Sequence, residues 1–344
     1  MISSFKRLWR DRRGNALAIA GAALPLVLGS AGLASDTIQW TLWKRQLQRA
    51  ADSAAMAGVY AIASDRAVGR NSPENAVTGI NATGSTDVDL GCGMITNSTS
   101  LTAAVATGSS EVTASPIAAV GGIPASTHWG TGTVLQPFTL AQEDPFKDVP
   151  IPSYDPSSCS NFPNVKNGDV LDRSADTGVI CFKTAMDPKG TLILGKATYV
   201  LNGAGLDLNN TGSKISCNEC TIIFTSSTAA TDPTSIKSPN VNGGVLDMVA
   251  PKTGTYKGIM MYQDRRATFN NAIQINGNNG SKMEGAYYFP RADFTFNGTS
   301  GIDSKCLQIV TKRVTFTGNS DIQNVCPSDS GGGAFDGQRI RLVE

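Results

Sequence analysis

Phe294-Thr295-Phe296-Asn297-Gly298 and Val314-Thr315-Phe316-Thr317-Gly318 share one pattern, in which apolar and polar residues alternate and a glycine ends the run. Ile273-Gln274-Ile275-Asn276-Gly277 shows the same pattern, and the three segments start 21 and 20 residues apart. Such alternation is typical of a strand with one buried face, and a period of about 20 residues is typical of stacked repeats. One repeat cannot bury its apolar face alone, so each must cover the next. We therefore predict a mainly β protein whose body is a right-handed parallel β-helix.

The predicted β-helical body extends from residue 166 to residue 344. Its earlier part keeps the pattern less regularly, with glycines between short apolar strands at Thr191–Leu194, Ala197–Leu201, Leu206–Leu208 and Thr221–Phe224. A β-sandwich is the alternative fold, because it is also built from many short strands with turn residues between them.

The composition fits short strands and many turns. Of 344 residues, 36 are glycine, and only 17% are charged. The net charge of +1 hides an asymmetry, because the first thirteen residues carry a net charge of +4 and the rest of the chain sums to −3. A mildly acidic body offers no broad basic surface to phosphates, which argues against nucleic-acid binding.

Gly14 to Ser35 is a run of 22 residues without a charge. As a helix it would be roughly 33 Å long, enough to cross a hydrocarbon core of about 30 Å. We therefore predict a transmembrane helix at residues 14–35 and a cytoplasmic tail at residues 1–13, because basic residues favour the cytoplasmic side. The body then lies on the far side of the membrane.

Two other interpretations of this segment stay open. A cleaved signal peptide also combines a basic start with an apolar core, although that core is usually 7–15 residues long. A pilin-type leader would be cut after Gly14, but such proteins usually carry glutamate at the fifth mature position, where this chain has Ile19. A retained anchor is the interpretation that we favour.

Residues 36–62 are predicted to form an amphipathic juxtamembrane helix. Small and apolar residues recur along it at helical spacing, which lets another helix approach closely. The candidate contact face consists of Leu47, Ala50, Ala54, Gly58 and Ala61. This face packs either on the protein's own domain or on a partner subunit, and the sequence leaves both open.

Residues 63–136 are predicted to form a small β-rich region, because Thr, Ser, Ala, Val and Gly dominate it. Residues 137–165 contain repeated prolines, which prevent regular helix or central strand and predict an extended connector. His128 is the sole histidine of the chain, which argues against a hydrolase triad and against an imidazole zinc site.

Seven cysteines lie in the body, and in an oxidising compartment most of them should pair. We predict no cofactor or metal, since a single Cys-x-x-Cys is too little for a four-cysteine zinc site. The candidate disulfide cysteines are, in pairs, Cys159 with Cys181, Cys217 with Cys220, and Cys306 with Cys326. Cys92 is then the odd one, although sequence alone does not determine the connectivity.

Three charged segments are candidates for a catalytic site, because many β-helices act on polysaccharides. These segments are Asp264-Arg265-Arg266, Arg291-Ala292-Asp293 and Asp303-Ser304-Lys305. Glycosidases need two carboxylates that face the scissile bond, and none of the three segments contains a carboxylate pair. We interpret them as solvated or salt-bridged surface charges and assign no catalytic residue.

The N-terminus resembles a known family. Two segments look like parts of the N-terminal domain of TadG-like proteins, which belong to the Tad (tight adherence, Flp pilus) assembly system. These segments are Asp11-Arg12-Arg13-Gly14-Asn15 and Gln46-Leu47-Gln48-Arg49-Ala50-Ala51-Asp52-Ser53-Ala54-Ala55. Ser35-Asp36 departs from the Val-Asp that is more frequent there. The resemblance implies a single-pass protein of the bacterial inner membrane with a periplasmic or surface-facing body, pilus-assembly proteins as partners and no enzymatic activity.

The predicted function is thus a non-enzymatic structural or assembly component of a Flp/Tad-type pilus. Two alternatives come from other functional classes. One is a membrane-tethered carbohydrate-active β-helix enzyme. The other is a surface adhesin whose body binds glycan or matrix without chemistry.

Overall fold

The computed structural model describes residues 21, 23–25, 28, 39–49, 51, 78–90, 92–268, 271–277, 280–298, 302–318 and 321–324. The chain divides into two units, residues 1–66 with 341–344, and residues 67–340. In the first unit, residues 39–49 are helical and exposed.

The predicted membrane span lies mostly outside these residues. No helix in the described part of the chain combines the length and the apolar character needed to cross a membrane. Only residues 21, 23–25 and 28 of the predicted span at 14–35 are described, so the span stays a prediction. Of the candidate helix-contact face, Leu47 is helical and exposed, whereas Ala50, Ala54, Gly58 and Ala61 lie outside the described residues.

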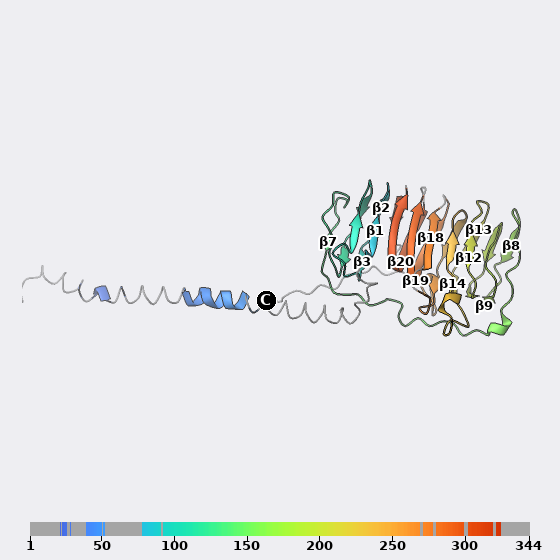
Figure 1. The fold of residues 1–344 in the computed structure, drawn as a ribbon, viewed down its shortest axis with the longest axis horizontal. Helices are drawn as coiled ribbons and strands as arrows, with labels where there is room; N and C mark the ends of the chain where they lie inside the picture. The colour runs from blue at the N-terminus through green and yellow to red at the C-terminus, as the bar shows by residue number, and fades with distance from the viewer. Residues whose placement is uncertain are drawn as a thin grey trace, which may run out of the picture. The chain divides into compact units, whose positions relative to one another are not determined.

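In its described residues, the second unit consists of short strands, two long strands of 17 residues each (β19 and β20) and two single turns of 3₁₀ helix (Figure 1). The strands of its first part are β1 (Ile80–Ala82), β2 (Asp87–Asp89), β3 (Met94–Thr96), β4 (Ala104–Ala106), β5 (Glu111–Thr113), β6 (Ile117–Ala119) and β7 (Leu135–Gln136). After the 3₁₀ turn η2 (Pro156–Ser158) come β8 (Val170–Arg173), β9 (Gly178–Phe182), β10 (Thr191–Leu194), β11 (Ala197–Asn202), β12 (Leu206–Leu208), β13 (Lys214–Asn218) and β14 (Thr221–Thr225). After η3 (Pro233–Ser235) come β15 (Pro239–Val241), β16 (Val245–Val249), β17 (Ile259–Gln263), β18 (Asn271–Gly277), β19 (Lys282–Gly298), β20 (Ile302–Gly318) and β21 (Asp321–Asn324).

The strands pair in three columns, and every pairing between the described strands is parallel. The first column contains β8, β10, β13, β16 and the start of β19. The second contains β9, β11, β14, β17 and the middle of β19, and the third contains β12, β15, β18 and the end of β19. The prediction of a mainly β body is therefore confirmed, whereas a sandwich of antiparallel sheets does not describe these strands.

We call one passage of the chain through the three columns a circuit. Each circuit places apolar side chains over the apolar side chains of the preceding circuit. Leu192, Ile215 and Leu246 are register partners in the first column, and all three are almost fully buried. Burying a side chain of this size stabilises the fold by about 1.5–3 kcal/mol. The core is thus a continuous ladder of apolar residues, as the alternating pattern predicts.

The N-terminal strands continue this stack at its other end. Ile80 of β1 is in register with Val314 of β20 on one side and with Ala104 of β4 on the other. In Figure 1 the red β20 lies beside the cyan β1. Residues 63–136 were predicted to be a region of their own, but β1, β2, β4 and β5 belong to the same sheet as the body, whereas β3, β6 and β7 form a separate three-stranded parallel sheet.

The register aligns three further five-residue segments with this pattern, although Val105 replaces the first polar residue in one of them. Ile80-Asn81-Ala82-Thr83-Gly84, Ala104-Val105-Ala106-Thr107-Gly108 and Pro239-Asn240-Val241-Asn242-Gly243 all end in Asn or Thr followed by Gly. Gly84 and Gly108 have φ of 80° and 77°, a conformation that residues with a Cβ rarely adopt. The amide of Ser109 donates to the Gly84 carbonyl at 2.8 Å, so these turns are also hydrogen-bonded from circuit to circuit.

The junction between β1 and β20 can be tested by cross-linking. Asn81 and Thr315 are adjacent register partners, so their Cα atoms should lie about 4.8 Å apart, within the range of a disulfide. We expect Asn81→Cys with Thr315→Cys to oxidise to a cross-link that peptide mass mapping detects under non-reducing conditions. In the matched control, Asn81→Cys with Thr295→Cys, the cysteines are two strands or about 10 Å apart and should stay unlinked. Equal cross-linking in both would contradict the register.

Candidate functional site: a strap over the second column

The outer face of the second column is apolar, unlike that of an ordinary exposed sheet. Ile223, Tyr262 and Tyr288 are register partners that point away from the main core, yet all three are fully buried. Residues 144–151 of the predicted connector cover this face, and we call them the strap. Phe146, Val149 and Ile151 of the strap pack against these side chains in a second, smaller hydrophobic cluster.

Two buried tyrosines hold the strap by its backbone. The Tyr262 hydroxyl donates to the carbonyl of Val149 at 2.8 Å, and the Tyr256 hydroxyl donates to the carbonyl of Pro150 at 2.9 Å. Burial raises the pKa of each phenol to about 12. Both groups therefore stay protonated and act as donors over the whole physiological pH range.

Arg265 connects the strap to the third tyrosine. Its Nε donates to the Tyr288 hydroxyl at 2.6 Å, and its Nη1 donates to the Val149 carbonyl at 3.1 Å. The Tyr288 hydroxyl in turn donates to Asp144 at 2.5 Å, and Nε lies 3.5 Å from the same carboxylate. The guanidinium also lies over the Tyr262 and Tyr288 rings, with its carbon 5.7 and 5.2 Å from their centroids. Burial, and then the hydrogen bond to Asp144, raise the pKa of Tyr288.

Asp264 points into the body rather than toward the strap. Its side chain is 3% exposed and pairs with Arg266 at 2.6 Å, while the Thr225 hydroxyl donates to it at 2.6 Å. Burial by itself raises the pKa of this carboxyl, but the hydrogen bonds from Arg266 and Thr225 together outweigh it and leave the pKa below its ordinary value. The prediction of a surface position for Asp264 is wrong, because the side chain is buried, whereas the predicted salt bridge is present.

The charged residues of the Arg291-Ala292-Asp293 segment are also engaged in local contacts. Asp293 pairs with Arg313 at 3.0 Å, and Arg291 Nε donates to the carbonyl of Arg265 at 3.0 Å. The side chains of Asp303 and Lys305 lie outside the described residues. Across the part of the chain that is described, no group of three His, Cys, Asp or Glu residues is placed to hold a metal ion. Chemically, these charged groups hold segments in place.

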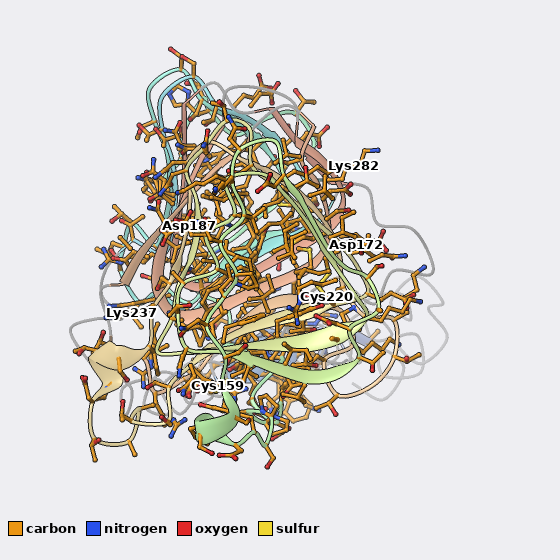
Figure 2. All side chains as sticks on the ribbon, turned by 90° about the vertical axis from the view of Figure 1, so that its right-hand side faces the viewer. Cys159, Asp172, Asp187, Cys220, Lys237 and Lys282 are labelled. Atoms are coloured by element: carbon orange, nitrogen blue, oxygen red, sulfur yellow. A yellow bond between two sulfur atoms is a disulfide. The ribbon has the colours of Figure 1, made fainter. Side chains whose placement is uncertain are left out.

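Two of the predicted disulfides are present. Cys159, which follows η2, is bonded to Cys181 of β9, and Cys217 is bonded to Cys220 across the turn between β13 and β14. Figure 2 looks onto the β8 end of the stack, where Cys159 lies. The first disulfide ties the end of the connector to the circuit that it leads into. The pairing of Cys306 with Cys326, and with it the assignment of Cys92 as the odd cysteine, lies outside the described side chains and stays a prediction.

The strap contacts were not predicted from the sequence, although the sequence contains a signal for them. β14 and β17 are buried on both faces, and Ile259-Met260-Met261-Tyr262 contains no polar residue in alternation. A short strand that is apolar on both sides indicates a covered outer face. The segment that covers this outer face is the strap, which lies within the proline-rich connector.

Removing Arg265 should loosen the strap. Arg265→Ala leaves the Tyr288 hydroxyl without its buried donor and removes one of the two donors to the Val149 carbonyl, which keeps the Tyr262 hydroxyl. This loss costs about 1–3 kcal/mol in the free energy of unfolding. We expect urea unfolding to show this loss and limited proteolysis to cut faster within residues 144–151. Lys147→Ala is the matched control, because Lys147 pairs with Glu143 on the exposed side of the same segment and should leave both measurements unchanged. Equal effects of the two variants would contradict the role of Arg265.

The Asp264 cluster predicts a specific acid sensitivity. Because the folded-state pKa of Asp264 is lowered, its stabilisation is present above the unfolded-state pKa of about 3.9 and is lost as the pH falls through the folded-state pKa. Asp264→Asn should therefore lower the free energy of unfolding at pH 7 by about 1–3 kcal/mol, and this difference should shrink below pH 4. Asp187→Asn, which removes an exposed pair with Lys189, should show no such pH-dependent difference in urea unfolding. A difference that stays constant with pH would contradict the assignment.

Comparison with known proteins gives a match at the N-terminus. Residues 14–65 match the family described as "Putative Flp pilus-assembly TadE/G-like". Comparison with curated proteins and with solved structures finds no match to the chain. The matched range agrees with the resemblance that the Arg-Arg-Gly start and the Gln-Arg-Ala-Ala-Asp-Ser segment indicate, and that resemblance is confirmed. Residues 14–65 of the chain are thus similar to the TadE/G-like Flp pilus-assembly family.

Proposed function

We propose that the protein is a non-enzymatic, membrane-anchored structural component of a Flp/Tad-type pilus system. The observation that carries this proposal is the family match over residues 14–65. In this proposal residues 14–35 anchor the chain in the bacterial inner membrane and residues 1–13 stay in the cytoplasm. The partners are proteins of the pilus-assembly machinery, which contact the helix face that includes Leu47.

The body acts in this proposal as a stiff spacer in the form of a right-handed β-helix. The three parallel columns support this form, since a chain that visits three columns in turn winds as a coil. The strap adds rigidity, because it fixes the outer face of one column through Arg265 and the tyrosines. The two disulfides support a periplasmic or surface-facing location, because such bonds persist in oxidising compartments.

A structural role rather than an enzymatic one is supported by how the carboxylates are used. Asp264, Asp144 and Asp293 each lie in an ion pair with an arginine. A glycosidase instead presents two carboxyl groups to a bond between them.

Fractionation of the full chain in its own bacterium tests the anchor. We expect the protein to stay with inner membranes through alkaline carbonate extraction and its mature N-terminus, measured by intact mass, to lie upstream of residue 14. A variant in which a cleavable signal peptide replaces residues 1–35 should instead release a soluble body. Extraction of the unaltered chain into the soluble fraction would overturn the anchor.

Piliation tests the role itself. Deletion of the gene should abolish Flp-type pili and surface attachment, and the full chain should restore both. The variant with residues 1–35 replaced should accumulate as folded protein without restoring them. Normal piliation after deletion, with loss of a polysaccharide-cleaving activity instead, would overturn the proposal in favour of an enzyme.

A further inference from the structure

The outer face of the third column is polar, and its side chains stack in two rows. The column continues from β15 and β18 through the ends of β19 and β20 to β1 and β4 (Figure 1). The first row consists of Asn240, Gln274, Thr295, Thr315, Asn81 and Val105. The second row, two positions later on each segment, consists of Asn242, Asn276, Asn297, Thr317, Thr83 and Thr107. We call these two rows the polar ladder.

The polar ladder contains no charged residue. Every position in it is Asn, Gln or Thr, except Val105, and each side chain is exposed or half-buried. Charged residues lie around it, and these are Asp207 in register with Asn240, the ion pair of Asp293 with Arg313, and Asp87 and Glu111 on the strands that follow two of the turns. A ligand on the polar ladder itself would therefore be held by hydrogen bonds between neutral groups.

The amides at the β15 end are oriented by hydrogen bonds to one another. Gln274 Nε2 donates to Asn276 Oδ1 at 3.1 Å, and Asn276 Nδ2 donates to Asn242 Oδ1 at 3.1 Å. Asn242 Nδ2 donates to Asn240 Oδ1 at 2.6 Å. An amide side chain has two N–H donors and an acceptor oxygen with two lone pairs, so each of these groups keeps further hydrogen-bonding capacity. Side chains that are already held in place lose less entropy when a ligand binds.

The spacing of the polar ladder is regular. Neighbouring strands lie about 4.8 Å apart, and outward positions two residues apart on one strand are separated by about 6.6 Å. Six stacked segments therefore extend over roughly 24 Å. A matching ligand is an extended polymer that presents a hydrogen-bonding group at short, regular intervals.

The polar ladder ends at a hollow beside β4. The hollow has a volume of about 320 Å³, and Val105 and Thr107, the last members of the two rows, form part of its wall. The rest of the wall comes from Ala106, Gly108, Pro124, Ala125, Ser126 and His128. The Ser126 hydroxyl donates to the Ala106 carbonyl at 3.2 Å, so the outer part of the wall is bonded to β4. The volume falls within the range of about 300–1,000 Å³ that is usual for small-molecule sites.

We propose that the polar ladder and the hollow bind an uncharged polysaccharide, with the extended chain along the stack and its terminal sugar in the hollow. Sugar hydroxyls donate and accept hydrogen bonds, as Thr hydroxyls and Asn and Gln amides also do. Nucleic acids instead require basic residues, and the energetic centres of protein contacts are enriched in Trp, Tyr and Arg. The twelve positions contain neither kind of residue. The proposal goes beyond the pilus role and does not depend on it.

Calorimetric titration of the full chain, in a detergent without a sugar headgroup, tests the site. The uncharged probes are cellohexaose and the N-acetylated chitohexaose, which distinguish a plain glucan from an amino-sugar polymer. We expect at least one of them to bind, and its disaccharide to bind at least about tenfold more weakly, because it reaches fewer of the stacked segments. Hexagalacturonate should bind more weakly than the better uncharged probe, because its carboxylates would be desolvated without basic partners.

Three variants place the ligand on the polar ladder and in the hollow. Gln274→Ala and Thr295→Ala should each weaken binding of the better hexasaccharide about three- to tenfold, because each removes one hydrogen-bonding group. Ala125→Trp should weaken it by a similar factor, because the indole fills the hollow. Ser216→Ala is the matched control, since Ser216 is a half-buried outward residue of the first column, and it should leave binding unchanged. The thermal unfolding midpoint of each variant shows whether the fold is retained.

Four results would overturn the proposal. Three are a lack of binding to both uncharged hexasaccharides, equal binding of hexagalacturonate, and equal losses in Gln274→Ala and Ser216→Ala. The fourth is self-association of the chain alone that Gln274→Ala abolishes, because a second copy would then occupy the polar ladder.

Discussion

Parallel hydrogen bonding from one circuit of the chain to the next is the constraint on which this structure depends. It fixes a register in which Leu192 lies over Ile215 and Ile215 lies over Leu246. The same register brings turn glycines such as Gly84 and Gly108 over one another, so a side chain at either would meet the neighbouring turn. A shift by one residue would send the inward residues to solvent. The five-residue pattern therefore recurs in the sequence because the register requires the same residue types at the same position of each circuit.

The order of the circuits has a consequence for the connector. β1 stacks against β20, near the end of the chain, while β8 opens the circuits at the far end of the stack. The chain must therefore pass along the outside of the body between β7 and β8. Its proline residues lack amide donors, but its carbonyls still need partners when buried. Tyr256, Tyr262 and Arg265 supply them.

The hydrogen bonds and ion pairs described above accordingly hold segments of the body together. Arg265 donates hydrogen bonds to the Val149 carbonyl of the strap and to the Tyr288 hydroxyl. Asp264 forms an ion pair with Arg266 and accepts a hydrogen bond from the Thr225 hydroxyl. The two disulfides likewise join neighbouring parts of the fold, one at the start of the circuits and one within a turn.

The sequence by itself determined the period, the mainly β character and the similarity of residues 14–65 to the TadE/G-like family, because each depends on a local pattern. Alternation over five residues, for example, indicates a strand with one buried face. The pairs Cys159–Cys181 and Cys217–Cys220 were also accessible, since they are close in sequence. Only the tertiary structure decided that Ile80 continues the circuit of Val314, that residues 144–151 cover the second column, and that Asp264 is buried. Each of these depends on contacts between residues more than 35 positions apart, in which the free energy comes from surfaces that no local pattern brings together.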